Sequence, residues 1–140
     1  MALVAGLGAA FAFSLFVWVV LRKGRGQPGD HVFRASRLSS GNRVFPTQVL
    51  ISASSVTHYR PQWIGRLEQS IHISHVASIR IDTNILFSDV IIETTGGHRP
   101  IECHGHSKAD AVEMKRLIEQ FQSAFYREGK GAGEDRAGAL

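Results

Sequence analysis

The chain has 140 residues, with 16 lysines and arginines against 12 aspartates and glutamates, a net charge of +4 and 44% hydrophobic residues. Apart from one apolar segment of about twenty residues, the chain is long enough for one domain with a modest core and too short for two. Cys103 is the only cysteine, which excludes an intramolecular disulfide bond and makes an oxidising compartment unnecessary.

The apolar segment stands at the start of the chain. Residues 2–21 contain no charged side chain, and Ser14 is their only hydroxyl. At about 1.5 Å per residue, a helix of this length matches the roughly 30 Å core of a bilayer. A cleaved signal peptide would need a basic start, a shorter apolar core and a small-residue cleavage site. We therefore predict a retained transmembrane anchor over residues 1–22.

Small residues recur every four positions within this segment. Gly6, Ala10 and Ser14 share one helix face, a pattern that lets two membrane helices approach closely and form a homo-oligomer. The alternative is that glycine and alanine are simply common in membrane anchors.

Basic residues crowd behind the apolar segment, and Asp30 is the only acidic residue among them. They are Arg22, Lys23, Arg25, Arg34, Arg37 and Arg43. By the positive-inside rule this flank faces the cytoplasm, so we expect a single-pass protein of the inner membrane with its folded part cytoplasmic. The same rule makes nucleic-acid binding the weaker interpretation of the charge. Residues 23–42 are interpreted as a basic linker in which Arg22, Lys23 and Arg25 contact anionic lipid.

Short alternating segments follow the linker and predict an antiparallel β-structure of about six or seven strands. Gly96-Gly97 is a hairpin signal within this part of the chain. The expected strands are residues 43–51, 56–60, 67–73, 78–83, 87–95 and 99–105.

A single amphipathic helix is predicted after the strands. Ser107 and Asp110 are typical of a helix N-terminus, and apolar residues then recur at helical spacing. These are Ala111, Met114, Ile118, Phe121 and Phe125, with Leu117 and Ala124 widening the stripe. Residues 127–140 have no apolar period, and we expect a disordered tail there.

This arrangement resembles the bacterial pleckstrin-homology-like (PH-like) domain, in which a C-terminal helix covers a meander of strands. Residues 65–79 (GRLEQSIHISHVASI) are similar to its pattern of a strand, a short turn and the next strand. Residues 91–97 (IIETTGG) are similar to its later hairpin. The resemblance implies an α+β fold in which a PH-like barrel or sandwich, residues 43–126, is capped by one helix.

The chain departs from the phosphoinositide-binding members of that family. Those members use basic residues in the first strand pair, and residues 44–59 contain no lysine or arginine. They also usually place a tryptophan in the final helix, where this chain has Phe121 and Phe125. The resemblance therefore implies a membrane-anchored binding or scaffolding module without phosphoinositide binding.

Histidines near the end of the strands form the candidate metal site. His98, His104 and His106 are close enough in sequence to begin a zinc or haem site, although a structural zinc site needs four ligands. The alternative is partly solvated histidines at a strand end. Cys103 is interpreted as a small core residue rather than a nucleophile. No catalytic motif is present, so we expect neither an enzyme nor a cofactor.

The strongest functional signal in the folded part is the turn at residues 61–65. Trp63 and Ile64 are flanked by Arg60 and Arg66, a composition typical of a protein-binding hot spot or of a loop that enters a lipid interface. The alternative is that Trp63 folds back over the sheets. The leading hypothesis is a membrane-anchored module that binds another protein, and the second is a small metal- or haem-binding membrane protein.

Overall fold

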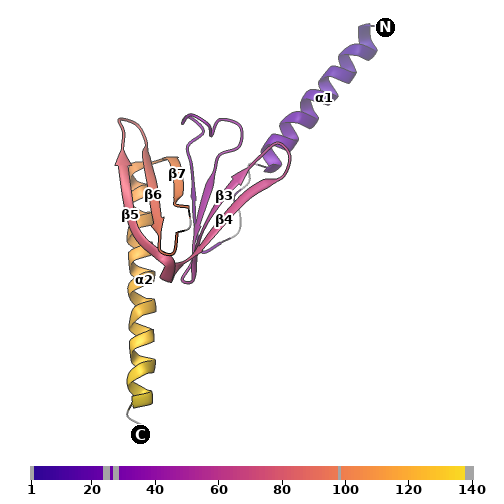
Figure 1. The fold of residues 1–140 in the computed structure, drawn as a ribbon. Helices are drawn as coiled ribbons and strands as arrows, with labels where there is room; N and C mark the ends of the chain where they lie inside the picture. The colour runs from indigo at the N-terminus through magenta and orange to yellow at the C-terminus, as the bar shows by residue number, and fades with distance from the viewer. Residues whose placement is uncertain (1, 24–25, 27–28, 98, 138–140) are drawn as a thin grey trace.

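The structure, a computed structural model, describes residues 2–23, 26, 29–97 and 99–137. Of residues 2–7, 23 and 131–137 only the backbone is described. The fold is α+β: two antiparallel sheets lie between an N-terminal helix and a C-terminal helix, whose outer ends point in opposite directions (Figure 1). The α+β class and the C-terminal helix predicted from the sequence are therefore confirmed.

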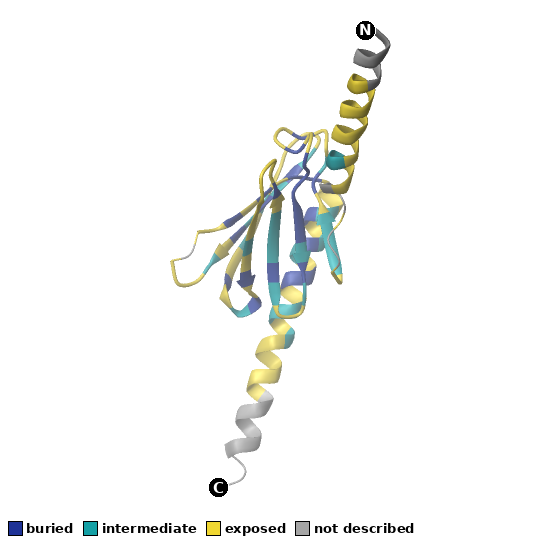
Figure 2. Cartoon of the chain, turned by 90° about the vertical axis from the view of Figure 1, so that its right-hand side faces the viewer, coloured by how far each residue is buried: buried dark blue, intermediate teal, exposed yellow. Residues whose placement is uncertain are grey.

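Helix α1, Ala2–Lys23, forms where the apolar segment predicts a helix. Its described side chains are almost all exposed, including Phe11 at 71% and Phe13 at 69%, and the helix projects away from the sheets (Figure 2). Counting only the residues that the structure describes, no helix is long and apolar enough to cross a membrane.

The first sheet contains β1 His31–Arg34, β2 Gln48–Ile51, β3 Ser55–Pro61 and β4 Arg66–His72, in that order and all antiparallel. Strand β1 corrects the prediction that residues 23–42 are only a linker. Its four residues are too few to show a period, and they become a strand because β2 pairs with them along their whole length, from His31 opposite Ile51 to Arg34 opposite Gln48.

The segment before β2 is an ordered loop rather than the start of the predicted strand at residue 43. Asn42 is buried and joins three parts of the chain. Its amide nitrogen donates to Ser39 Oγ (2.8 Å) and to the carbonyl of His104 (3.2 Å), and its Oδ1 accepts from the backbone N–H of Thr47 (3.0 Å). Because Asn42 binds the amide of Thr47, and Pro46 has no N–H, strand β2 begins only at Gln48, preceded by one hydrogen bond from the N–H of Ala35 to the carbonyl of Thr47 (2.9 Å).

The second sheet contains β5 Val76–Thr83, β6 Ser88–Thr94 and β7 Ile101–His106. The short 3-10 helix η1, Ile73–His75, separates β5 from β4, so the two sheets share no ladder among the described residues and no barrel is closed. The bounds of β3 to β7 lie within a few residues of the alternating segments predicted after residue 55. Gly96 and Gly97 have φ of 85° and 76°, as the predicted hairpin turn requires.

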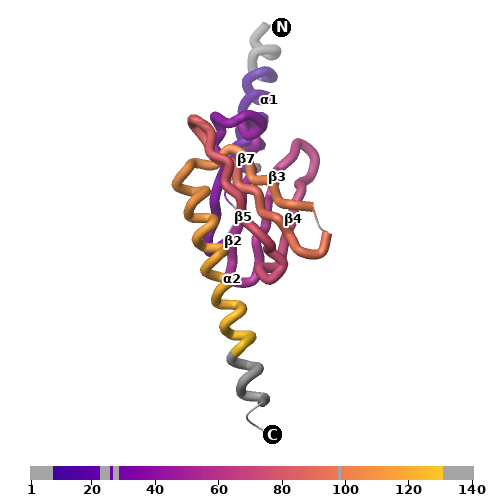
Figure 3. Tube along the Cα trace, turned by 60° about the vertical axis from the view of Figure 1, so that its left-hand side comes forward, coloured from indigo at the N-terminus to yellow at the C-terminus, as the bar shows by residue number. Residues whose placement is uncertain are grey.

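Helix α2, Lys108–Ala137, contacts both sheets and η1 (Figure 3). The backbone N–H of Asp110 donates to Ser107 Oγ (3.0 Å), which confirms the predicted N-terminus. The helix continues through most of the segment expected to be a disordered tail. Extending a helix that is already packed is easier than nucleating one, and this explains the difference.

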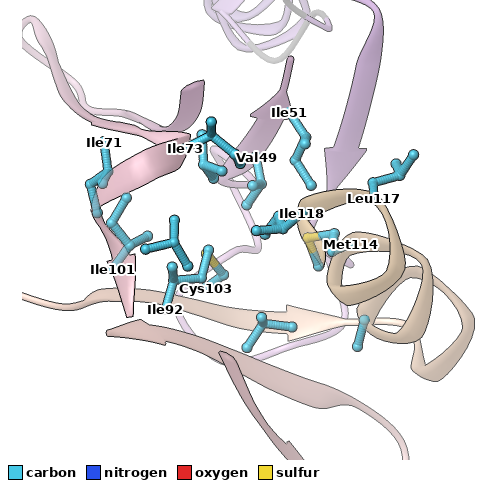
Figure 4. Close-up of a cluster of buried hydrophobic side chains, with 14 residues drawn as sticks. Val49, Ile51, Ile71, Ile73, Ile92, Ile101, Cys103, Met114, Leu117 and Ile118 are labelled. Atoms are coloured by element: carbon cyan, nitrogen blue, oxygen red, sulfur yellow. The ribbon is translucent and has the colours of Figure 1, made fainter. Parts of the chain in front are cut away.

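The hydrophobic core lies where α2 faces both sheets (Figure 4). Ala111, Met114 and Ile118 are fully buried, as the helical spacing predicts, and Phe121 is half-buried against the same cluster. Phe125 is 40% exposed, and its ring packs edge-on against His72 rather than in the core. The helix therefore covers the sheets with its first four turns.

Candidate functional site

The tip of the β3–β4 hairpin presents the two large apolar residues singled out from the sequence. The turn is narrow because Gly65 has a φ of 82°, and the N–H of Gln62 donates to the carbonyl of Gly65 (3.4 Å). This turn leaves Trp63 59% exposed and Ile64 93% exposed. Both side chains therefore lie at the exposed tip of the hairpin.

Trp63 does not fold back over the sheets. Its ring lies edge-on to Phe45 with centroids 4.9 Å apart, and it stacks on Phe16 of α1 with centroids 5.9 Å apart. Aromatic pairs at such distances are favourable beyond their buried area. Trp63 therefore connects the hairpin, the β1–β2 loop and α1.

An open groove of about 720 Å³ lies between the hairpin and the β1–β2 loop. Arg43 and Phe45 line it from the loop, and Arg60, Trp63 and Ile64 line it from the hairpin. We call it the hairpin groove. It combines apolar rings with two guanidinium groups, so it offers both a surface that excludes water and charge-assisted hydrogen bonds.

Of the four residues that the sequence predicts for a contact surface, the hairpin groove brings together three: Arg60, Trp63 and Ile64. Arg60 lines it, whereas Arg66 is directed to Glu68, with Nε 3.7 Å from the carboxylate. Arg43 takes the second basic position and Phe45 adds an aromatic ring; the sequence did not single out either for the groove. The only sequence signal for them is an arginine two residues before a phenylalanine in the loop that precedes Pro46.

The end of α1 nearest the sheets carries the first of the predicted lipid-contacting residues. Arg22 is exposed, and its guanidinium carbon lies 5.0 Å from the centre of the Trp18 ring, within the range of a cation–π contact. The side chains of Lys23 and Arg25 lie outside the described part. Ala10 and Ser14 are both exposed on α1, and the Gly6 prediction concerns a residue for which only the backbone is described.

Of the predicted metal ligands, His104 and His106 do not lie on one face. His104 is exposed, with Nδ1 3.2 Å from Asp89 and Nε2 3.4 Å from Glu102, whereas His106 is fully buried. Gly105 lies between them with a φ of 76°, which interrupts the alternation that would place both on one face. His98 lies outside the described residues. Among those described, no group of three or more histidine, cysteine or acidic residues is arranged to hold a metal ion.

Two buried side chains of β7, those of Cys103 and His106, have strongly shifted pKa values. Burial lowers the pKa of His106 to about 4, and neither of its ring nitrogens has a hydrogen-bond partner within the described structure. Burial, and secondarily Asp89, raises the pKa of the Cys103 thiol to about 12. Cys103 is thus a neutral core residue, as predicted, and is unsuited to nucleophilic chemistry at neutral pH.

A smaller pocket of about 80 Å³ lies between β3 and β7 and is lined by His58, Arg60, Glu102 and His104. Burial, followed by the charges of Arg60 and His104, lowers the pKa of His58. The pocket is large enough for water but much smaller than ordinary ligand pockets. The hairpin groove therefore remains the better candidate for binding.

Comparisons with protein-family models, with curated proteins and with solved structures found no match for this chain. The candidate site is therefore identified by its geometry alone. It consists of an exposed aromatic and aliphatic tip, two arginines and a groove beside α1.

Proposed function

We propose that this protein is a single-pass, membrane-anchored PH-like module that binds another protein through the hairpin groove at the cytoplasmic face of the inner membrane. The observation that carries the proposal is the position of Trp63, exposed at the tip of the hairpin and stacked on α1.

The anchor part of the proposal is supported by the composition of α1. Residues 2–21 carry no charge, and most of the described side chains of this helix, such as Phe11 and Leu15, are exposed. Apolar side chains at this density are unfavourable in water and favourable in a bilayer core. The basic residues that follow support a cytoplasmic domain by the positive-inside rule.

The PH-like part is supported by the order of elements. A four-stranded antiparallel meander, a three-stranded antiparallel meander and a C-terminal helix follow one another, and the helix packs on both sheets. This order agrees with the resemblance carried by residues 65–79 and 91–97.

Protein binding is supported by the composition of the hairpin groove. Tryptophan and arginine are the residue types most enriched at binding hot spots, and Trp63 stands beside Arg43 and Arg60. Ile64, exposed at 93%, provides an aliphatic side chain that a partner would bury. Because the domain is held at the membrane, a weak contact with a membrane-bound partner gains from the effective concentration.

The test is affinity capture from membranes solubilised in mild detergent, with the full chain as bait. Trp63→Ala removes the central ring of the groove, and Tyr126→Ala is the matched control because Tyr126 is an aromatic residue of similar exposure (54%) on α2. We expect a partner that is captured by the wild type and by Tyr126→Ala and is lost with Trp63→Ala. Equal capture by all three would contradict binding at the groove, provided that circular dichroism shows that the variants are folded.

A further inference from the structure

The most exposed large apolar side chains of the described residues lie in loops rather than on α1. They are Ile64 at 93%, Ile85 at 92%, Leu38 at 83% and Leu86 at 75%. A single exposed apolar residue is ordinary, but four at the tips of three loops form a pattern. Only Ile64 belongs to the hairpin groove.

The three loops lie at the end of the domain from which α1 projects (Figures 1 and 3). The β1–β2 loop is the middle one. With the β5–β6 loop it borders an open groove of about 520 Å³ lined by Ser39, Ser40, Ile85 and Leu86. On its other side it borders the hairpin groove through Gly41 and Arg43. The exposed tips therefore belong to one continuous face.

Hydrogen bonds hold the loops in these positions. The N–H of Ser36 donates to the carbonyl of Gly105 (2.8 Å), so the β1–β2 loop is bound to β7 just before Leu38. The N–H of Asn84 donates to the carbonyl of Phe87 (2.8 Å), which closes the turn that carries Ile85 and Leu86. The tips are therefore held outward by backbone contacts.

Charge on this face is suited to an anionic surface. Arg37 and Arg43 are exposed on the β1–β2 loop. Of the acidic residues beside the β5–β6 tip, Asp82 has a basic neighbour, with its carboxylate 4.0 Å from Nε of Arg80. Basic residues close to an anionic membrane add attraction to the burial of apolar tips.

We propose that Leu38, Ile85 and Leu86 enter the headgroup region of the bilayer that α1 spans, so that the domain docks on the membrane with the far end of α2 pointing away from it. The inference depends on the anchoring part of the proposed function. A bilayer is the favoured occupant because α1 leaves from this end, which places the membrane beside these loops. Docking would also fix the hairpin groove at the membrane surface.

The test uses the full chain in lipid nanodiscs containing phosphatidylglycerol, with one nitroxide label at a time. Labels are attached at Leu38→Cys, Ile85→Cys, Phe11→Cys in α1 and Tyr126→Cys near the far end of α2. The unsubstituted chain controls for Cys103, which is fully buried. Electron paramagnetic resonance then measures how often each label collides with a water-soluble nickel chelate and with oxygen.

We expect a severalfold loss of nickel-chelate collisions at Leu38 and Ile85 relative to Tyr126, and a loss of that protection in nanodiscs of phosphatidylcholine alone. Protection at Phe11 together with full accessibility at Ile85 would overturn docking and leave the anchor in place. Full accessibility at both would overturn docking and anchoring together. Protein capture through Trp63 is measured separately and does not decide either outcome.

A second variant tests whether the tips act as one face. Leu86→Asp places a charge at the β5–β6 tip, and Val112→Asp places one on α2 at another exposed apolar residue (63%). Docking predicts that Leu86→Asp restores nickel-chelate access to the label at Leu38, whereas Val112→Asp does not. Equal effects of the two charges would contradict a shared docking face.

Discussion

His106 lies fully buried at the end of β7, and both of its ring nitrogens lack hydrogen-bond partners within the described structure. Burial opposes its protonation, and the nearby Asp110 only partly offsets that effect, so its pKa falls from 6.5 to about 4. The folded protein therefore keeps this imidazole neutral at pH values where an unfolded chain would protonate it.

The first prediction follows from this difference. Well above pH 6.5 His106 is neutral in both states and does not make stability depend on pH. As the pH falls from 6.5 toward 4, only the unfolded chain gains the proton, so stability is lost. At about 1.4 kcal/mol per pH unit the loss is about 3 kcal/mol.

Thermal unfolding in detergent between pH 4 and 7 measures this loss. We expect His106→Leu to flatten the dependence, while His58, whose pKa is also lowered, leaves a residual slope. An unchanged slope in His106→Leu would contradict the assignment.

Gly105 is the second residue on which the fold depends. Its φ is 76°, and a Cβ at this position would collide with Ser39 Oγ in the β1–β2 loop. Gly97 is a matched control, because it has the same φ of 76° and no atom near its added Cβ.

We predict that Gly97→Ala reduces the free energy of unfolding by about 1 kcal/mol through backbone strain. Gly105→Ala should cost a further 1 to 3 kcal/mol, roughly, through overpacking. Chemical denaturation measures both values, and Ser39→Gly should recover part of the loss in Gly105→Ala. Equal losses for the two glycines would show that the loop does not pack on β7 as described.

At the scale of elements, the sequence predicts the helices and strands that have enough residues to show a repeating pattern of apolar side chains. The helical spacing of Met114 and Ile118 corresponds to a buried face in the structure. In strand β3 Val56 is fully buried, whereas His58 is only half-buried, like its neighbours Thr57 and Tyr59. Strand β1 is missed because four residues carry no period and depend on β2 for pairing.

Some residues of the candidate site could not be predicted from sequence patterns. The hairpin tip with Trp63 could be predicted from its local composition. Phe45 and Arg43 join it because the β1–β2 loop is bound to β7, and one of these bonds runs from Asn42 to the carbonyl of His104, 62 positions along the chain. Contacts between such distant residues leave no local pattern.

At the scale of elements, the testable prediction concerns the packing of helix α2 on the two sheets. Met114 is fully buried against both sheets, whereas Val112, two residues earlier in the same helix, is 63% exposed. Met114→Ala should reduce the free energy of unfolding by about 2–5 kcal/mol, and Val112→Ala should change it by less than about 0.5 kcal/mol. Denaturant unfolding followed by circular dichroism distinguishes them, and similar effects would contradict the packing of α2 as the cover of the sheets.

At the scale of the whole molecule, α1 and the far part of α2 extend in opposite directions from the sheets (Figure 1). The proposed anchor therefore places the loops beside the membrane and the far end of α2 away from it. Contacts of Trp63 with Phe16 and Phe45 connect the hairpin groove to α1.

The orientation is a separate prediction. Because six basic residues and one acidic residue lie between residues 22 and 43, the positive-inside rule places the domain in the cytoplasm. Green fluorescent protein fused after Leu140 should fluoresce, and alkaline phosphatase fused there should be inactive. Active phosphatase with no fluorescence would reverse the orientation.

Site-specific photo-crosslinking in cells tests the central claim, protein binding at the hairpin groove, most directly. A benzoylphenylalanine replaces Ile64, which is 93% exposed at the tip, or Tyr126 as the control. We predict one discrete protein adduct from position 64 that disappears when Trp63→Ala is added, and no such adduct from position 126. The absence of a protein adduct at position 64, or one that persists with Trp63→Ala, would contradict the proposed function.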